Sequence, residues 1–232
     1  METDYLALEK LINVQFGDKK MLQNAFVHRS YLNEHKDFEL PSNEKLEFLG
    51  DSVLSLITSI YLYKNYSDLK EGDYTDIKAS IVRTESLAEA ARRLQLGNYL
   101  HLSRGQEQEQ GRDNTNILAD TFEALLAVIF LDKGFDTAYQ FIEKNLFKDK
   151  LNTIIKNKLY LSPKSRLQEY LQAKYKVTPT YIVLREEGPE HLRTFTVAAM
   201  FAEKAIGTGS GKSKKEAEEA AAENAFEKRD HF

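Results

Sequence analysis

The segment 117–131, ILADTFEALLAVIFL, constrains the fold more than any other part of this chain of 232 residues. Its apolar residues cover nearly the whole circumference of a helix, so this helix must be buried on all sides. The rest of the first 150 residues supplies helices to surround it, because apolar residues recur there every three or four positions and no strand pattern is convincing. We therefore predict an all-α domain over 1–150. The other helical segments are 5–14, 20–26, 44–63, 77–96 and 137–147.

Breaks in this pattern predict where helices end. Gly97 follows ARRLQL, and Gly134 follows the LDK that closes the apolar run. Both are typical positions for a glycine just after a helix. Residues 103–116, SRGQEQEQGRDNTN, are polar and contain two glycines. This composition predicts a mobile, exposed loop.

After residue 150 the pattern changes. Residues 151–161 read as a linker, and Ser162 followed by Pro163 predicts the start of a helix. Residues rich in β-branched and aromatic side chains then predict strands, and Ser213 with Glu216 suggests a capping box before a last, alanine-rich helix. The chain is thus predicted to be multidomain, with a small α+β (α-β-β-β-α) domain over 162–232. Its expected elements are the helix 163–175, strands at 180–187, 193–201 and AIGTGSG, and the helix 214–226.

Charge and composition narrow the class of protein. Residues 1–150 hold 18 Lys and Arg against 25 Asp and Glu, whereas 151–232 hold 14 against 11. A basic tail on an acidic body hints at a nucleic-acid or membrane-surface module. The absence of cysteine excludes disulfides, thiolate metal sites and a cysteine nucleophile. The longest apolar stretch, 124–131, is far shorter than the roughly 20 residues that cross a bilayer. With no signal-peptide pattern at the N-terminus, we expect a cytoplasmic protein and no membrane partner.

The first group of carboxylates lies in NEKLEFLGDS, residues 43–52. On a helix, Glu44, Glu47 and Asp51 share one narrow stripe, roughly opposite the apolar residues. A solvated acidic face explains this stripe on geometry alone. However, like charges at this spacing repel each other, and Lys45 lies too far off the stripe to relieve them.

A second pair, Asp120 and Glu123, lies on one face of the buried helix. Buried carboxylates are very costly unless they are protonated, paired or bound to a metal. A structural alternative is that Arg83 or Arg112 pairs with them. If instead they meet the first group, the result is an oxygen-only site that suits Mg²⁺ or Mn²⁺. No Glu-x-x-His pair, Walker loop or nucleophile elbow is present, so metal-assisted hydrolysis at phosphorus is the best chemical hypothesis.

These motifs resemble those of the ribonuclease III family. NEKLEFLGDS is similar to the family signature and differs from its usual form only at Lys45. Asp120-Thr121-Phe122-Glu123-Ala124 resembles the second acidic element, and AFVHRSY at 25–31 resembles an early family segment. The tail from Ser162 looks like a double-stranded-RNA-binding domain. The resemblance covers nearly the whole chain.

The resemblance implies an endoribonuclease that cuts double-stranded RNA as a homodimer with Mg²⁺, for which Mn²⁺ can substitute, and without an organic cofactor. It implies 5′-phosphate and 3′-hydroxyl ends with two-nucleotide 3′ overhangs, and processing of rRNA precursors and some tRNA and mRNA. Phe48 matches an aromatic residue at the dimer interface, with core packing as the alternative. Glu44 and Glu71 match supporting acids, although Glu71 could equally be an exposed loop acid. The implied metal ligands are Glu47, Asp51, Asp120 and Glu123, of which Asp51 and Glu123 are the expected catalytic residues.

The expected RNA contacts lie in the tail. Glycines at 207–211 would let the backbone approach phosphate, and lysines follow at a helix N-terminus, where anions are favoured. Solvated lysines on an ordinary surface helix are the alternative. By resemblance, such domains recognise the shape of A-form RNA across about 16 base pairs. The predicted RNA-binding residues are Gln168, Gln172, His191, Lys212, Lys214 and Lys215.

Two other functions fit the sequence less well than a nuclease does. A non-catalytic RNA-binding protein of the same fold would be expected to have lost one of the four acids, and all four are present. A helical scaffold or metal-storage protein accounts for neither the acidic motif nor the basic tail.

Overall fold

The computed structural model describes residues 5–148, 151–189 and 192–229. The chain forms two compact units, 1–155 (unit 1) and 156–232 (unit 2). The first six residues of the predicted linker are helical, as α9 (Leu151–Lys156), so the division between the units falls within that helix.

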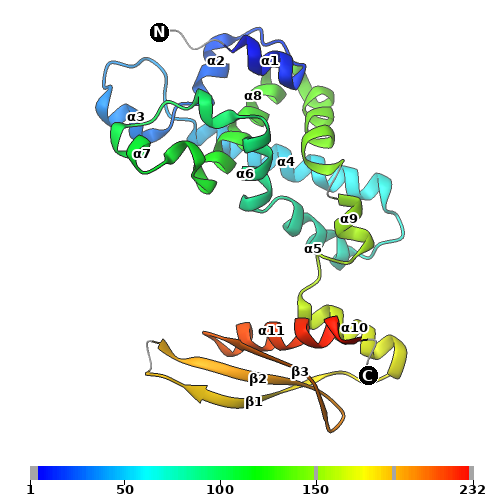
Figure 1. Ribbon diagram of the computed structural model, residues 1–232. Helices are drawn as coiled ribbons and strands as arrows, with labels where there is room; N and C mark the ends of the chain where they lie inside the picture. The colour runs from blue at the N-terminus through cyan, green and yellow to red at the C-terminus, as the bar shows by residue number, and fades with distance from the viewer. Residues whose placement is uncertain (1–4, 149–150, 190–191, 230–232) are drawn as a thin grey trace. The chain divides into compact units, whose positions relative to one another are not determined.

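Unit 1 is helical, as predicted (Figure 1). Outside the helices, the described part contributes only an isolated bridge between Val27 and His101. Besides α9, the helices are α1 (Leu6–Ile12), α2 (Lys19–Asn24), α3 (Arg29–Glu34), α4 (Glu44–Asn65), α5 (Glu71–Ile81), α6 (Thr84–Arg93), α7 (Arg104–Gln108) and α8 (Thr115–Ile142), with short turns η1 (Leu96–Tyr99), η2 (Gly111–Asp113) and η3 (Glu143–Phe147).

The apolar segment that constrains the sequence is the centre of unit 1. It forms α8, against which α4 and α6 pack, and every residue from Ala124 to Ile129 is fully buried. The Asn114 side chain caps its start by accepting hydrogen bonds from two backbone N–H groups. The helical backbone is interrupted at Gly134, whose φ of 79° suits glycine. The helix end predicted at this glycine is therefore confirmed.

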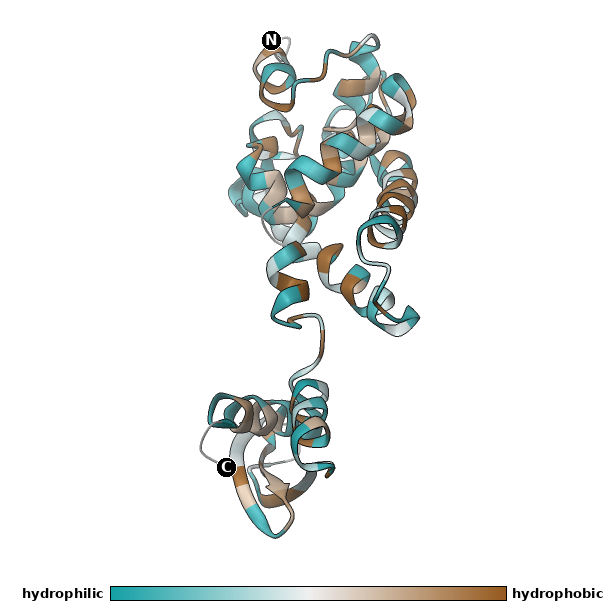
Figure 2. Cartoon of the chain, turned by 90° about the vertical axis from the view of Figure 1, so that its right-hand side faces the viewer, coloured by the Kyte–Doolittle hydropathy of each residue, from teal (hydrophilic) through white to brown (hydrophobic). Residues whose placement is uncertain are grey.

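The helix α4 is the main partner of α8. The helices of unit 1 carry both hydrophobic (brown) and hydrophilic (teal) residues along their length, as expected of amphipathic helices (Figure 2). By length and composition alone, α4 could cross a membrane. Its packing on α8 accounts for the same apolar content.

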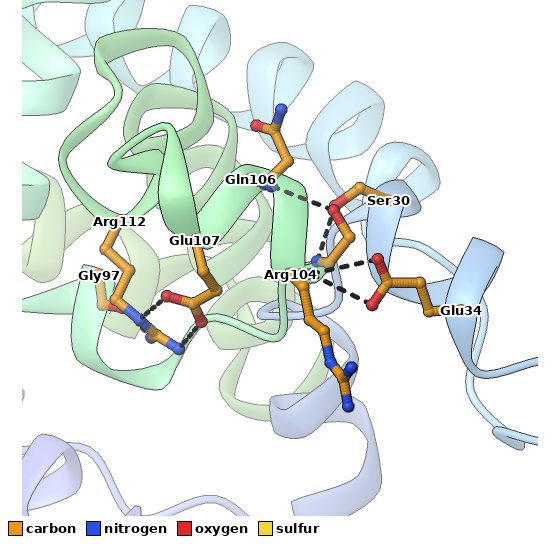
Figure 3. Close-up of polar contacts among 8 residues, drawn as sticks. Ser30, Glu34, Gly97, Arg104, Gln106, Glu107 and Arg112 are labelled. Atoms are coloured by element: carbon orange, nitrogen blue, oxygen red, sulfur yellow. Dashed lines mark hydrogen bonds and ion pairs between the residues drawn. The ribbon is translucent and has the colours of Figure 1, made fainter.

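Two helical predictions need correction. The segment 77–96 is not one helix, because Arg83 is extended and separates α5 from α6. Residues 103–116 are not a featureless loop, since they contain α7 and η2. The Ser30 hydroxyl accepts from the Ser103 N–H at 3.1 Å, and the Glu34 carboxylate accepts from the Arg104 N–H at 3.1–3.2 Å (Figure 3).

A second set of polar contacts holds the C-terminal part of residues 103–116. Arg112 pairs with Glu107 and donates to the Gly97 carbonyl at 2.7 Å (Figure 3). The contacts with Ser30, Glu34 and Gly97 lie outside this segment, so its local composition could not reveal them.

Unit 2 has the predicted α-β-β-β-α order. Ser162 caps α10 through the Ser165 N–H, with Pro163 as the first helical residue. The sheet is antiparallel in the order β1-β2-β3. The two helices and the inward-facing residues of β2, such as Val197 and Ala199, enclose a small core. The elements are α10 (Pro163–Tyr175), β1 (Thr180–Glu187), β2 (Thr194–Phe201), β3 (Lys204–Gly211) and α11 (Lys214–Glu227).

The glycines of β3 have a packing role that was not predicted from the sequence. A Cβ atom on Gly209 would lie 2.2 Å from the Ala221 nitrogen, and one on Gly207 would lie 2.5 Å from the Ala225 nitrogen. They let β3 approach α11, and their close contacts are with this helix. At the start of α11 the Ser213 side chain accepts from the Glu216 N–H, but Glu216 accepts in return from Lys212 N–H, so the predicted capping box is shifted by one residue.

Candidate metal centre and RNA-binding surface

Three of the predicted metal ligands meet where α4 and α8 pack together. Glu47 lies on α4, and Asp120 and Glu123 lie on α8. One carboxylate oxygen of each lies within 4.8 Å of the other two, and all three side chains are partly buried. We call these three residues the acidic cluster. Carboxylate oxygens at such spacing can hold a divalent cation.

Gly50 allows the two helices to come this close. A Cβ atom built on it would lie 1.9 Å from the carbonyl oxygen of Glu123, which is far inside any allowed contact. Gly50 lies one helical turn after Glu47, so the closest approach of the helices is at the acidic cluster. This residue was not singled out from the sequence, although it lies inside NEKLEFLGDS.

The acidic cluster is electrostatically costly without a cation. Burial raises the pKa of Glu123 to about 8, and the charges of Asp51, Asp120 and Glu47 add to this rise. Burial also raises the pKa of Asp120 and of Glu47, the latter with help from Asp120. A bound divalent cation would reverse this effect and keep the carboxylates ionised.

Asp51 does not belong to the group of three, and its side chain is exposed. It is nevertheless close enough for its charge to raise the pKa of Glu123, as the largest cause after burial. The structure therefore places Asp51 beside the acidic cluster without bringing its oxygens within the 4.8 Å spacing of the other three.

The arginines named as alternative partners lie elsewhere. Arg83 pairs with Glu85 at 3.9 Å, and Arg112 pairs with Glu107. The cation near the acidic cluster is instead Arg29, at the start of α3, whose charge lowers the pKa of Glu47 and Asp120 against the effect of burial. Its ion-pair partner in the structure is Glu44, at 3.7 Å.

A cleft of about 620 Å³ opens beside the acidic cluster. Glu47 and Asp120 line one part of it, together with Arg29 and Glu44. Most of the remaining lining is uncharged and polar. Those residues include Ser30, Asn33, Asn43, Gln106, Asn114 and Asn116. Sequence reasoning missed Arg29 and this polar lining, although the segment 25–31 contains both Arg29 and Ser30.

Two further predicted residues of unit 1 lie away from this cleft. Glu71 is the first residue of α5 and lines a separate hollow of about 720 Å³ with Tyr63, Tyr74 and Phe135. Phe48 is 78% exposed, so core packing within this chain is excluded for it.

In unit 2 most of the predicted RNA contacts are exposed. Gln168 and Gln172 lie one turn apart on α10 and therefore share a face. His191 lies outside the described residues. The three lysines precede or begin α11 and are exposed; they are Lys212, Lys214 and Lys215.

Comparison with known families agrees with this division. A family model described as "Ribonuclease-III-like" matches residues 18–150, and one described as "Double-stranded RNA binding motif" matches residues 163–229. The chain is 45% identical to Ribonuclease 3 of Caldanaerobacter subterraneus subsp. tengcongensis over 95% of its length and 96% of the relative's. It is 42% identical to Ribonuclease 3 of Oceanobacillus iheyensis, over 97% of each chain.

Solved structures resemble unit 1. The nuclease domain of ribonuclease III from Campylobacter jejuni is 32% identical, with a TM-score of 0.58, and the match covers 65% of this chain and 97% of that domain. A second structure of that domain, whose title refers to a region involved in dimer formation, gives 34% identity and a TM-score of 0.56 over 61% of this chain and 98% of the other. Together with the full-length relatives, these matches show that the chain belongs to the ribonuclease III family of double-stranded-RNA endonucleases.

Proposed function

We propose that this chain hydrolyses phosphodiester bonds of double-stranded RNA at the acidic cluster with Mg²⁺ as cofactor. The observation that carries the proposal is the convergence of Glu47, Asp120 and Glu123, with oxygens within 4.8 Å, from two different helices. Oxygen-only ligands suit a hard cation such as Mg²⁺, and Mn²⁺ should substitute for it. A bound divalent ion would supply charge stabilisation at the phosphoryl oxygens and a more acidic water.

The protein's own side chains would bind the ion and the substrate. Glu47, Asp120 and Glu123 would hold the ion, and Asp51 adds negative charge that strengthens the attraction for it. Arg29, on the wall of the cleft, offers a cation for a phosphate group of the substrate. The expected products carry 5′-phosphate and 3′-hydroxyl ends with two-nucleotide 3′ overhangs, and the expected substrates are rRNA precursors and some tRNA and mRNA.

A homodimer is the second part of the proposal. The described part of one chain contains one acidic cluster, so a dimer would explain the cutting of both strands of a duplex. Phe48, Leu56 and Tyr63 are exposed apolar residues on α4, which is the kind of surface that another protein chain covers. The hollow beside Tyr63, lined mainly by apolar surface, offers a site for an aromatic side chain of the partner.

The test of the catalytic proposal is incubation of purified protein with long duplex RNA in Mg²⁺, in Mn²⁺ and in a chelator. Cutting that needs the metal supports it. Glu39→Gln is a matched control for Glu123→Gln, because Glu39 is an exposed acid that pairs with Lys20 at 3.3 Å. Metal-independent cutting, or loss of cutting in the control, would contradict the assignment of the acidic cluster.

The dimer is tested by light scattering on Phe48→Ala. We expect this variant to dissociate at concentrations where the wild type is a dimer. Leu6→Ala is the control, since Leu6 is also exposed but lies on α1. A monomeric wild type, or a Phe48→Ala variant that remains fully dimeric, would contradict this part of the proposal.

A further inference from the structure

An ion pair joins the two helices of unit 2 on one side. The Lys164 ammonium on α10 donates to the Glu218 carboxylate on α11 at 2.5 Å. The Lys164 side chain remains 38% exposed despite this bond. Because an ammonium has three donors, the bond to Glu218 leaves donors for a second acceptor.

This pair lies on the side that carries the predicted RNA contacts. Lys164, Gln168 and Gln172 are spaced four residues apart on α10, so they follow one face of the helix. On α11, Glu218 lies one turn after Lys214 and shares its face. The Lys164 ammonium therefore lies where the glutamine face of α10 meets the lysine face of α11.

The surroundings fix the position of the ammonium. Its nitrogen lies 4.7 Å from the centre of the Tyr181 ring, which holds it by a cation–π interaction in addition to the ion pair. Burial, with the nearby charge of Glu218, raises the pKa of Tyr181 to about 12, so this ring stays neutral at physiological pH. A lysine ordered in this way loses less side-chain freedom when it binds a further anion.

A second ion pair provides a natural comparison. Arg166, two residues after Lys164, pairs with Glu223 and so joins the same two helices. Two residues correspond to a rotation of about 200° around a helix, so Arg166 points away from the face of Gln168. Its side chain is only 14% exposed, and its guanidinium lies 5.3 Å from the centre of the Phe226 ring. This pair has the same structural task but is not on the predicted RNA-binding face.

We propose that Lys164 is a further RNA-binding residue, which contacts a backbone phosphate of the duplex while Glu218 holds it at the junction of α10 and α11. The inference rests on double-stranded-RNA binding by unit 2. It adds a contact from α10 to those of the three lysines near α11. Lys164 thereby links the part of the surface suited to the minor groove with the part suited to phosphates.

The test is the salt dependence of duplex-RNA binding by the full chain, measured in a chelator so that no RNA is cut. Loss of one phosphate contact lowers the slope of log K against log salt by about 0.9, so Lys164→Gln should reduce the affinity ratio between 50 and 200 mM salt by about 3.5-fold. Lys164→Arg keeps the charge and should keep the slope. Arg166→Gln is the matched control, which should lower the melting temperature of unit 2 without changing the slope.

An unchanged slope in Lys164→Gln would overturn the proposal. So would an equal change of slope in Arg166→Gln, because both variants would then act through the stability of unit 2. These outcomes differ from a failure of the proposed function, in which the wild-type chain itself would neither bind nor cut duplex RNA.

Discussion

The functional groups of unit 1 and unit 2 reach their positions in different ways. The acidic cluster of unit 1 combines α4 with α8, and neither helix carries the three carboxylates alone. The lysines of unit 2 are neighbours in sequence, at 212, 214 and 215, before and at the start of one helix. Unit 1 must hold partly buried like charges together, whereas unit 2 presents exposed charges to a partner. Changes in unit 1 should therefore alter catalysis and metal binding, and changes in unit 2 should alter affinity for RNA.

The largest expected effect is a loss of cutting by unit 1 with no loss of RNA binding by unit 2. Glu123→Gln removes one carboxylate of the acidic cluster. Because a bound metal ion would contribute several kcal/mol to the proposed transition state, cutting should fall by at least about 100-fold. Duplex-RNA binding measured by gel shift should remain near the wild-type level. If Glu123→Gln cuts normally, the assignment of the metal centre is wrong.

A matched pair of glycine substitutions tests the same separation through packing. Gly50→Ala would force a methyl group into the Glu123 carbonyl, and Gly209→Ala would force one into α11. Each should destabilise its own unit by about 1–3 kcal/mol or more, the usual cost of overpacking. Calorimetry should show Gly50→Ala lowering the melting temperature of unit 1 with loss of cutting, and Gly209→Ala lowering that of unit 2 with loss of RNA affinity. The reverse assignment would contradict the division of labour.

The double variant Lys214→Ala/Lys215→Ala tests the unit 2 side alone. Removing two phosphate contacts should weaken binding and lower the slope of log K against log salt by about 1.8. The maximal rate of cutting at saturating RNA should be unchanged. A fall in that maximal rate with unchanged affinity would show that these lysines act in catalysis instead.

The smallest expected effect is a change in the pH dependence of stability, which tests the burial of like charges in unit 1. Glu123 has a pKa of about 8 in the folded chain against an ordinary value of 4.5, so between these values the folded state holds a proton that the unfolded state has released. The stability of the metal-free protein should therefore fall as pH rises from about 4.5 to 8. Glu123→Gln should show a smaller fall in melting temperature across this range, measured in a chelator. Equal slopes for both proteins would contradict the raised pKa.

The sequence was most informative where local signals agree. Ser162 and Pro163 predict the start of α10 correctly, and Gly134 predicts the break in α8. The all-α and α+β units were predicted correctly for the same reason, because hydrophobic period and capping residues pointed to the same elements.

The sequence was least informative where contacts between residues far apart in the chain determine the local structure. Residues 103–116 form helical turns and make hydrogen bonds with Ser30 and Glu34, which no local pattern reveals. Asp51 shares the helical face of Glu47, but it is not in the group of three whose oxygens lie within 4.8 Å of one another. Arg29 was overlooked because a lone arginine at the start of a short helix carries no spacing signal.

The hydrogen bonds from Ser103 and Arg104 to α3 have a consequence for how a substrate enters. They join the segment that carries Gln106 to the helix that carries Arg29, and both residues line the cleft. The two sides of the cleft are thereby joined by hydrogen bonds, so we expect the cleft to be open before a strand of substrate enters it. The amide protons of Ser103 and Arg104 should accordingly exchange slowly with solvent even before RNA arrives.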